Sequence, residues 1–145
     1  MKDSKEIRPI VWENKILKLL DQTRLPIERV TVDITNYRDA VVAIRDMQVR
    51  GAPAIGVTAA YAVAMAAEEI LSSENDDFIK TLELACKEIS LARPTAVNLE
   101  WAVQRMLSLA TSRSSSPNVI TELFEEAEGI HRDDELINRR MGAFG

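Results

Sequence analysis

The first third of the chain has the apolar spacing of short β-strands. Residues 10–12 and 16–20 are apolar runs separated by Glu13–Asn14, a pair that predicts a two-residue hairpin turn. Residues 30–34 then alternate between apolar and polar side chains, as a half-buried strand does. We therefore expect a small antiparallel sheet within residues 7–34.

Beyond the sheet, apolar residues recur every three or four positions and predict helices over residues 36–111. Asn36 can cap the first helix, and Gly51 suits the left-handed conformation that often ends one. A second helix has Pro53 in its first turn and continues through an Ala-rich stretch to Ile70. The apolar face of the first helix comprises Tyr37, Val41, Ile44 and Met47.

Two further helices follow, separated by a break at Arg93–Thr95. The apolar face of the third helix comprises Phe78, Leu82, Cys86 and Ile89. The apolar face of the fourth comprises Leu99, Val103, Met106 and Ala110.

The last predicted helix carries an apolar stripe almost to Gly145. Ser116–Pro117 is a suitable cap and first-turn pair for it. Such a stripe needs a surface to bury it, so we expect a partner or a longer natural chain. The prediction is therefore an α+β fold, with residues 1–116 as one domain and 117–145 as a connecting helix. The stripe comprises Ile120, Phe124, Ala127, Ile130, Ile137, Met141 and Phe144.

Composition narrows the class of protein. The 145 residues are 46% hydrophobic with a net charge of −5, which suits one globular domain and does not favour a nucleic-acid binder. Cys86 is the single cysteine, so an intrachain disulfide is impossible and a cytoplasmic setting is expected. The sequence shows no signal peptide, and the apolar window Ala52–Ala67 is too short to span a membrane.

Charge is distributed unevenly along the chain. Residues 1–50 carry ten basic and eight acidic side chains, whereas the remainder carries eight and fifteen. An anion site is therefore better sought in the first third.

The segment Val49–Gly56 is the clearest candidate for chemistry. A helix start presents unpaired N–H groups and the positive end of a dipole, and no Ser, Thr, Asp or Asn precedes this one. Gly51 lets an anion approach the backbone, and Arg50 supplies a permanent cation. The pattern favours a phosphate site, although a helix–Gly–helix corner with a surface Arg has the same sequence. By itself, Arg93 before the fourth helix suggests only a solvated or ion-paired side chain.

Two motifs taken together resemble those of the methylthioribose-1-phosphate isomerases. These are Met47–Gly56 and Ala92–Leu99, and the resemblance extends over nearly the whole chain, including Arg8–Trp12 and Leu20–Gln22. This family comprises aldose–ketose isomerases of methionine salvage and is related to regulatory subunits of the exchange factor for translation initiation. The resemblance implies a sugar-phosphate substrate, no cofactor and a homodimer.

The resemblance also implies which residues bind the substrate. Arg50, Gly51 and Ala52 would contact it, with Arg93 as a second ligand. The family's catalytic cysteine and aspartate lie in a Rossmann-like C-terminal domain whose motifs are absent from this sequence, so no catalytic residue is assigned. A ribose-1,5-bisphosphate isomerase and a non-catalytic regulatory-subunit-like module remain alternatives.

The other reactive side chains have simpler interpretations. Cys86 lies on an apolar helix face and is expected in the core. His131 lies in an acidic stretch and is interpreted as a solvated surface side chain, as are Glu125, Glu126 and Glu128. No metal site, nucleotide-binding loop or nucleophile motif is identified.

Overall fold

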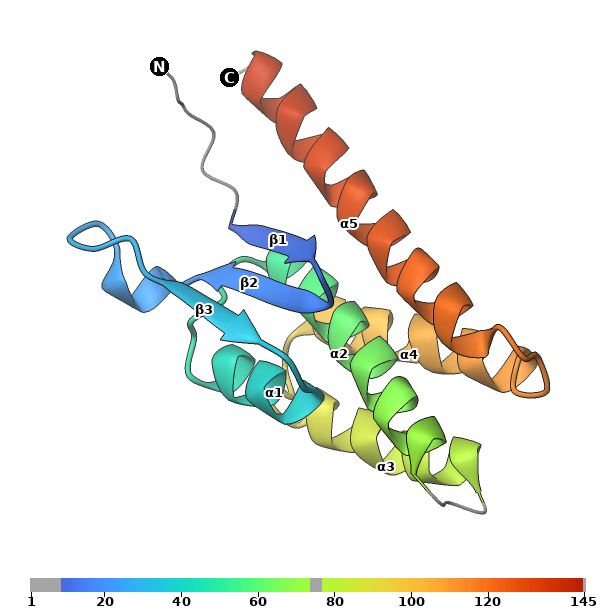
Figure 1. Ribbon diagram of the computed structural model, residues 1–145. Coiled ribbons are helices and arrows are strands. Elements are labelled where there is room, and N and C mark those ends of the chain that lie inside the picture. Colours follow the sequence, from blue (N-terminus) through green and yellow to red (C-terminus); the bar gives the residue numbers. More distant parts are fainter. Residues whose placement is uncertain (1–8, 74–76, 145) are drawn as a thin grey trace.

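The fold is a three-stranded sheet set against a group of helices, as Figure 1 shows. The computed structural model describes residues 9–73 and 77–144, with side chains up to residue 136. The sheet packs beside the first half of the central helix, and the last helix runs along the other side of that helix to extend past the sheet. The predicted α+β class, a small antiparallel sheet followed by a helical bundle, is confirmed.

The sheet has the antiparallel order β1 (Ile10–Glu13), β2 (Ile16–Leu20) and β3 (Thr31–Ile34). Glu13 pairs with Ile16, so the two-residue turn is Asn14–Lys15 and not Glu13–Asn14. Both turn residues have positive φ, 54° and 63°, as a type I′ turn requires. The predicted turn was therefore one residue too early, because Glu13 continues the ladder.

One face of the sheet is apolar because the register aligns the apolar positions of all three strands. Ile10 pairs with Leu19, and Leu17 pairs with Ile34, so these side chains lie on the same face. All four are buried. The polar residues Thr31 and Asp33 lie on the opposite face and are exposed, as the alternation predicted.

Helix α1 (Tyr37–Arg45) begins as expected but ends earlier than predicted. The Asn36 side chain accepts a hydrogen bond from the Asp39 N–H at 3.0 Å and caps the helix. The helix ends before Met47, which takes the left-handed conformation with φ 64°. Gln48 N–H then donates to Ala43 O, and Met47 N–H donates to Ile44 O, which together form a Schellman motif. A non-glycine residue therefore ends the helix, which is why the sequence pattern pointed to Gly51.

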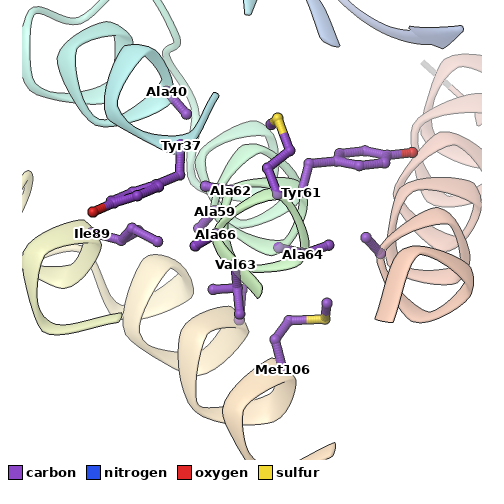
Figure 2. Close-up of a cluster of buried hydrophobic side chains, with 14 of the residues drawn as sticks. Tyr37, Ala40, Ala59, Tyr61, Ala62, Val63, Ala64, Ala66, Ile89 and Met106 are labelled. Atoms are coloured by element: carbon purple, nitrogen blue, oxygen red, sulfur yellow. The ribbon is translucent and has the colours of Figure 1, made fainter. Parts of the chain in front are cut away.

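Helix α2 (Ala52–Ser72) forms the centre of the core. In Figure 2, the helices of the domain surround it, with Ala59, Ala62 and Ala66 toward Tyr37 and Ile89, and Val63 toward Met106. Fourteen of its 21 residues are buried, and alanine at many of these positions lets the neighbouring helices approach closely.

By length and composition alone α2 could cross a membrane, so the argument that its apolar window is too short was wrong. Its most apolar window is 78% buried within the domain. Burial, and not length, therefore identifies α2 as a core helix.

Three helices complete the core: α3 (Phe78–Ser90), α4 (Val97–Ser112) and α5 (Val119–Phe144). The predicted faces of α3 and α4 are buried, with Phe78 only partly so. Helix α5 begins two residues after Pro117, and Ser116 Oγ accepts from the Asn118 N–H at 3.1 Å.

The buried face of α5 is shifted from the predicted stripe. Val119, Leu123, Ala127 and Ile130 are buried, whereas Ile120 and Phe124 lie at the edge of this face. The side chains predicted to continue the stripe beyond residue 136 lie outside the described residues. The domain boundary at residue 117 stays a prediction.

Gly56 lets the beginnings of α2 and α4 meet. A Cβ built on Gly56 would lie 3.2 Å from the backbone oxygen of Asn98, whereas one on Gly129 in α5 would meet only the tip of Arg132 at 3.9 Å. The two segments that carry the sequence motifs, Met47–Gly56 and Ala92–Leu99, are thus brought to the same end of the helix pair.

Alanine substitutions at Gly56 and Gly129 separate the effect of packing on stability from the effect of helix propensity. Both substitutions gain roughly 0.5–1 kcal/mol of helix propensity. We expect Gly56→Ala to be less stable than Gly129→Ala by about 1–3 kcal/mol, because only the first pushes a methyl group against a backbone carbonyl. Urea unfolding of the two variants measures this difference, and equal stabilities would contradict the close approach of α2 and α4.

Candidate phosphate-binding cleft

Helix α2 begins without a side-chain cap. Its N-cap residue is Gly51, whose φ of 93° is a conformation that glycine adopts without strain. The first helical hydrogen bond runs from the Ile55 N–H to Gly51 O at 3.0 Å. By contrast, Asn36 and Asp77 cap α1 and α3 through their side chains.

Backbone donors therefore remain available at this helix start. Among the described residues, the N–H groups of Gly51, Ala52 and Ala54 have no hydrogen-bond acceptor. Pro53 has no N–H, so the helix start offers three backbone donors. Unpaired N–H groups and the positive end of a long helix together favour an anion.

A cleft of about 270 Å³ lies beside this helix start. Arg50 and Gly51 line it, and Arg50 has no ion-pair partner among the described residues. Ala52 is exposed and is not one of the lining residues. The remaining walls come from the start of β1, the turn after β2, the start of α2 and helix α5: Pro9, Ile10, Gln22, Pro53, Ala54, His131, Asp134 and Glu135.

A buried carboxylate anchors the segment that precedes Arg50 in the chain. Asp21 is 4% exposed and accepts hydrogen bonds from the Thr23 N–H and from Gln48 Nε2 at 2.9 and 3.2 Å. The Gln22 N–H also donates to Gln48 O at 2.9 Å. Burial raises the pKa of Asp21, but hydrogen bonds from Thr23 and Gln48 outweigh it and leave that pKa below its ordinary value.

Arg93 stands at a second uncapped helix start. It is half-buried, its carbonyl accepts from the Ala96 N–H at 2.9 Å, and α4 has no side-chain cap at Ala96. The Gly56–Asn98 contact brings this helix start beside that of α2. Arg93 is not among the residues that line the cleft beside Arg50. The role of Arg93 as a second ligand of the same substrate thus stays a prediction.

His131 is not the solvated surface side chain that the sequence suggested. Its side chain is only 13% exposed, and its Nδ1 lies 2.9 Å from the Tyr61 hydroxyl. The acidic sequence around it gave no sign of this, because α5 turns this residue toward α2 while Arg132 and Asp133 remain exposed.

Acidic side chains form the wall of the cleft contributed by α5. Burial raises the pKa of Asp134, with a further contribution from Glu135, although His131 opposes the shift. The cleft thus has donors and a cation on the α2 side and carboxylate acceptors on the α5 side. This arrangement suits a ligand that combines an anionic group with hydroxyl groups.

Cys86 lies in the core, as expected. Burial raises the pKa of its thiol to about 12, so it is not an activated nucleophile. Over the described ranges, no group of three or more His, Cys, Asp or Glu side chains could hold a metal ion.

The chain is an α+β domain with a cleft beside an uncapped helix start, and comparison with known proteins gives its family. Residues 48–145 match the Initiation factor 2 subunit family, so the chain belongs to that family.

Curated relatives in this family include isomerases. The 5-deoxyribose 1-phosphate isomerase of Bacillus thuringiensis (strain Al Hakam) is 45% identical over 94% of this chain and 40% of its own length. The methylthioribose-1-phosphate isomerase of Acetivibrio thermocellus is 46% identical over 96% of this chain and 41% of its own length. The chain therefore spans about two fifths of the relatives it matches.

Solved structures agree on the fold. The 5-methylthioribose 1-phosphate isomerase of Pyrococcus horikoshii aligns with a TM-score of 0.80 and 32% identity, over 90% of this chain and 37% of that one. The delta subunit of translation initiation factor eIF-2B from A. fulgidus aligns with a TM-score of 0.78 and 35% identity, over 89% of this chain and 38% of that one.

Replacing the buried carboxylate tests the anchoring of the cleft. We expect Asp21→Asn to lower the free energy of unfolding at neutral pH by about 1–3 kcal/mol, because an amide is a poorer acceptor for the groups around it. The folded pKa of Asp21 is lowered, so its stabilisation is full above about pH 4 and is lost as pH falls through the folded pKa.

The variant should therefore lose less stability than the parent between neutral pH and about pH 3, as urea unfolding across this range would measure. Asp33→Asn, on the exposed face of β3, is the matched control and should behave like the parent. An identical pH dependence in the parent and in Asp21→Asn would contradict the role of this carboxylate.

Proposed function

We propose that this chain is the sugar-phosphate-binding part of an isomerase that converts 5-methylthioribose 1-phosphate to 5-methylthioribulose 1-phosphate. The observation that carries the proposal is the uncapped start of α2, where Arg50 and Gly51 line a cleft in a chain similar to isomerases of such phosphates. The setting would be methionine salvage in the cytoplasm, and the assembly a homodimer.

The proposed contacts follow the chemistry of a phosphate group. Arg50 offers a forked cation, and the N–H groups of Gly51 and Ala52 offer donors at the positive end of α2. Arg93 would add a second guanidinium from the start of α4, which Gly56 allows to lie beside α2. No metal or other cofactor is required for this binding role.

The reaction itself needs groups beyond this chain. A phosphate on C1 blocks simple opening of the sugar ring, so a proton donor must assist the ring oxygen before hydrogen moves between C2 and C1. We assign the acid and the catalytic cysteine to a C-terminal domain corresponding to the part of the relatives that this chain does not cover. This chain would provide the groups that bind the phosphate and one wall of a pocket that excludes water.

The relatives' names favour a single phosphate. Both 5-methylthioribose 1-phosphate and 5-deoxyribose 1-phosphate carry one phosphate and lack a hydroxyl on C5. A ribose 1,5-bisphosphate isomerase would need a second phosphate site, which the part of the relatives that this chain does not cover would have to supply.

A regulatory role is the second candidate, because the eIF-2B delta subunit has a similar fold. An interaction module has no need of an unpaired Arg and unpaired amides in one cleft, which favours the isomerase. A fusion of this chain to the uncovered part of the Acetivibrio thermocellus relative distinguishes the two roles. Turnover of 5-methylthioribose 1-phosphate by the fusion, with none by the chain alone, supports the isomerase. A folded fusion without turnover would favour the regulatory role.

Arg50→Ala in this fusion tests the phosphate contact. We expect substrate binding to weaken by about 2–4 kcal/mol, because a charge-assisted contact to phosphate is lost. The matched control is Arg45→Ala, which removes an exposed arginine paired with Asp46 outside the cleft and should leave binding unchanged. Steady-state kinetics measures the effect of each substitution on substrate binding. Equal effects of the two substitutions would contradict the assignment of Arg50 to the phosphate.

A further inference from the structure

His131 stands where two hollows meet on the surface between α5 and the start of β1. It lines the cleft that contains Arg50 and also a neighbouring hollow of about 190 Å³ that contains Trp12 and Tyr61. The two hollows share Ile10, His131 and Glu135 as walls. A ligand that has its phosphate at Arg50 and extends into the second hollow would therefore pass along the imidazole ring.

The imidazole of His131 is positioned by an aromatic stack that contains the buried Tyr61. Tyr61 is 1% exposed and stacks on Trp12 with centroids 5.0 Å apart, and Trp12 stacks in turn on Phe124 at 5.2 Å. Figure 2 shows Tyr61 reaching from α2 toward α5. The imidazole meets the Tyr61 ring edge-on at 87°, with its Nδ1 2.9 Å from the hydroxyl. A ring held by both an edge contact and a hydrogen bond to one buried side chain is pre-organised for binding.

The other ring nitrogen remains available. His131 Nε2 lies 3.8 Å from the nearer Glu135 carboxylate oxygen, which is beyond hydrogen-bonding distance. It has no other partner among the described residues, and no side-chain nitrogen or oxygen there is both buried and unpartnered. Nε2 is therefore accessible from the hollows.

The Tyr61 contact decides which nitrogen carries the proton in the neutral ring. The Tyr61 hydroxyl keeps its proton, because burial raises its pKa, and among the described residues Nδ1 is the one acceptor within its reach, so the hydroxyl donates to Nδ1. The remaining proton of the neutral imidazole then sits on Nε2 and makes it a donor.

We propose that His131 is a ligand-binding residue of this site, donating from Nε2 to a sugar hydroxyl of the ligand whose phosphate lies at Arg50 and Gly51. The proposal rests on the proposed function. It adds a contact from α5 to those from α2, and it gives the Tyr61–His131 pair a role in orienting the sugar relative to its phosphate. A purely structural role for His131 would need only Nδ1.

A titration followed by NMR tests this directly, because His131 is the only histidine in the sequence. The chain, prepared without a histidine tag, is titrated with 5-methylthioribose 1-phosphate and separately with inorganic phosphate. We expect the sugar phosphate to shift both the Gly51 and Ala52 amide signals and the imidazole signals. Inorganic phosphate should shift the amides alone, because it carries no sugar.

The outcomes separate this inference from the proposed function. If the sugar phosphate shifts the amides but leaves the imidazole unchanged, the phosphate site stands and the role of His131 is overturned. If the sugar phosphate shifts neither the amide nor the imidazole signals, both proposals are overturned. Equal imidazole shifts with inorganic phosphate would also overturn contact with the sugar.

Two substitutions distinguish ligand binding from a structural role. The amide of His131→Asn approximates Nδ1 and can keep the Tyr61 contact, whereas that of His131→Gln approximates Nε2 and keeps a donor toward the cleft. We expect His131→Asn to weaken sugar-phosphate binding about 5-fold, the value of one net hydrogen bond, and His131→Gln to retain most of it. Inorganic phosphate binding should be unchanged in both. The opposite order, with binding retained in His131→Asn and lost in His131→Gln, would show that His131 acts only through Tyr61.

Discussion

Burial of α2 on nearly every side is the constraint on which the rest of the structure depends. An Ala-rich helix has a narrow surface, so α1, α3, α4 and α5 can all pack closely around it, and the sheet adds its apolar face. Because its neighbours hold the body of α2 in place, the first turn of this helix cannot easily move. The start of α2, with Arg50 and Gly51, is thus presented in a fixed position for binding.

The same packing brings the second motif to the first. Gly56 removes the side chain that would separate α2 from the backbone of Asn98, so α4 begins beside the first turns of α2. Both helices lack side-chain caps, in contrast to α1 and α3. Two uncapped helix starts place two positive dipole ends close together, which is favourable only when an anion or water satisfies them. The packing and the proposed chemistry therefore depend on the same glycine.

Helix α5 adds a different kind of surface to the cleft. It contributes acceptors from Asp134 and Glu135 and a fixed imidazole from His131, whereas α2 contributes donors and a cation. Such a division suits a sugar phosphate, whose hydroxyl groups and phosphate need opposite partners. Membership of a family that contains isomerases and an initiation-factor subunit shows that the fold alone does not decide between these roles.

The sequence by itself determined the strand and helix order, most buried helix faces and the uncapped helix start at Gly51, because these depend on local spacing and on residues adjacent in the chain. The end of α1 was not predicted, since it depends on the conformation of one residue: Met47, and not the expected Gly51, takes the left-handed conformation that ends the helix. Only the tertiary structure placed Asp134 and His131 in the cleft. An acidic helical stretch has the same local pattern whether it faces solvent or a neighbouring helix, and the choice is made by the packing of α5 against α2, far away in the sequence.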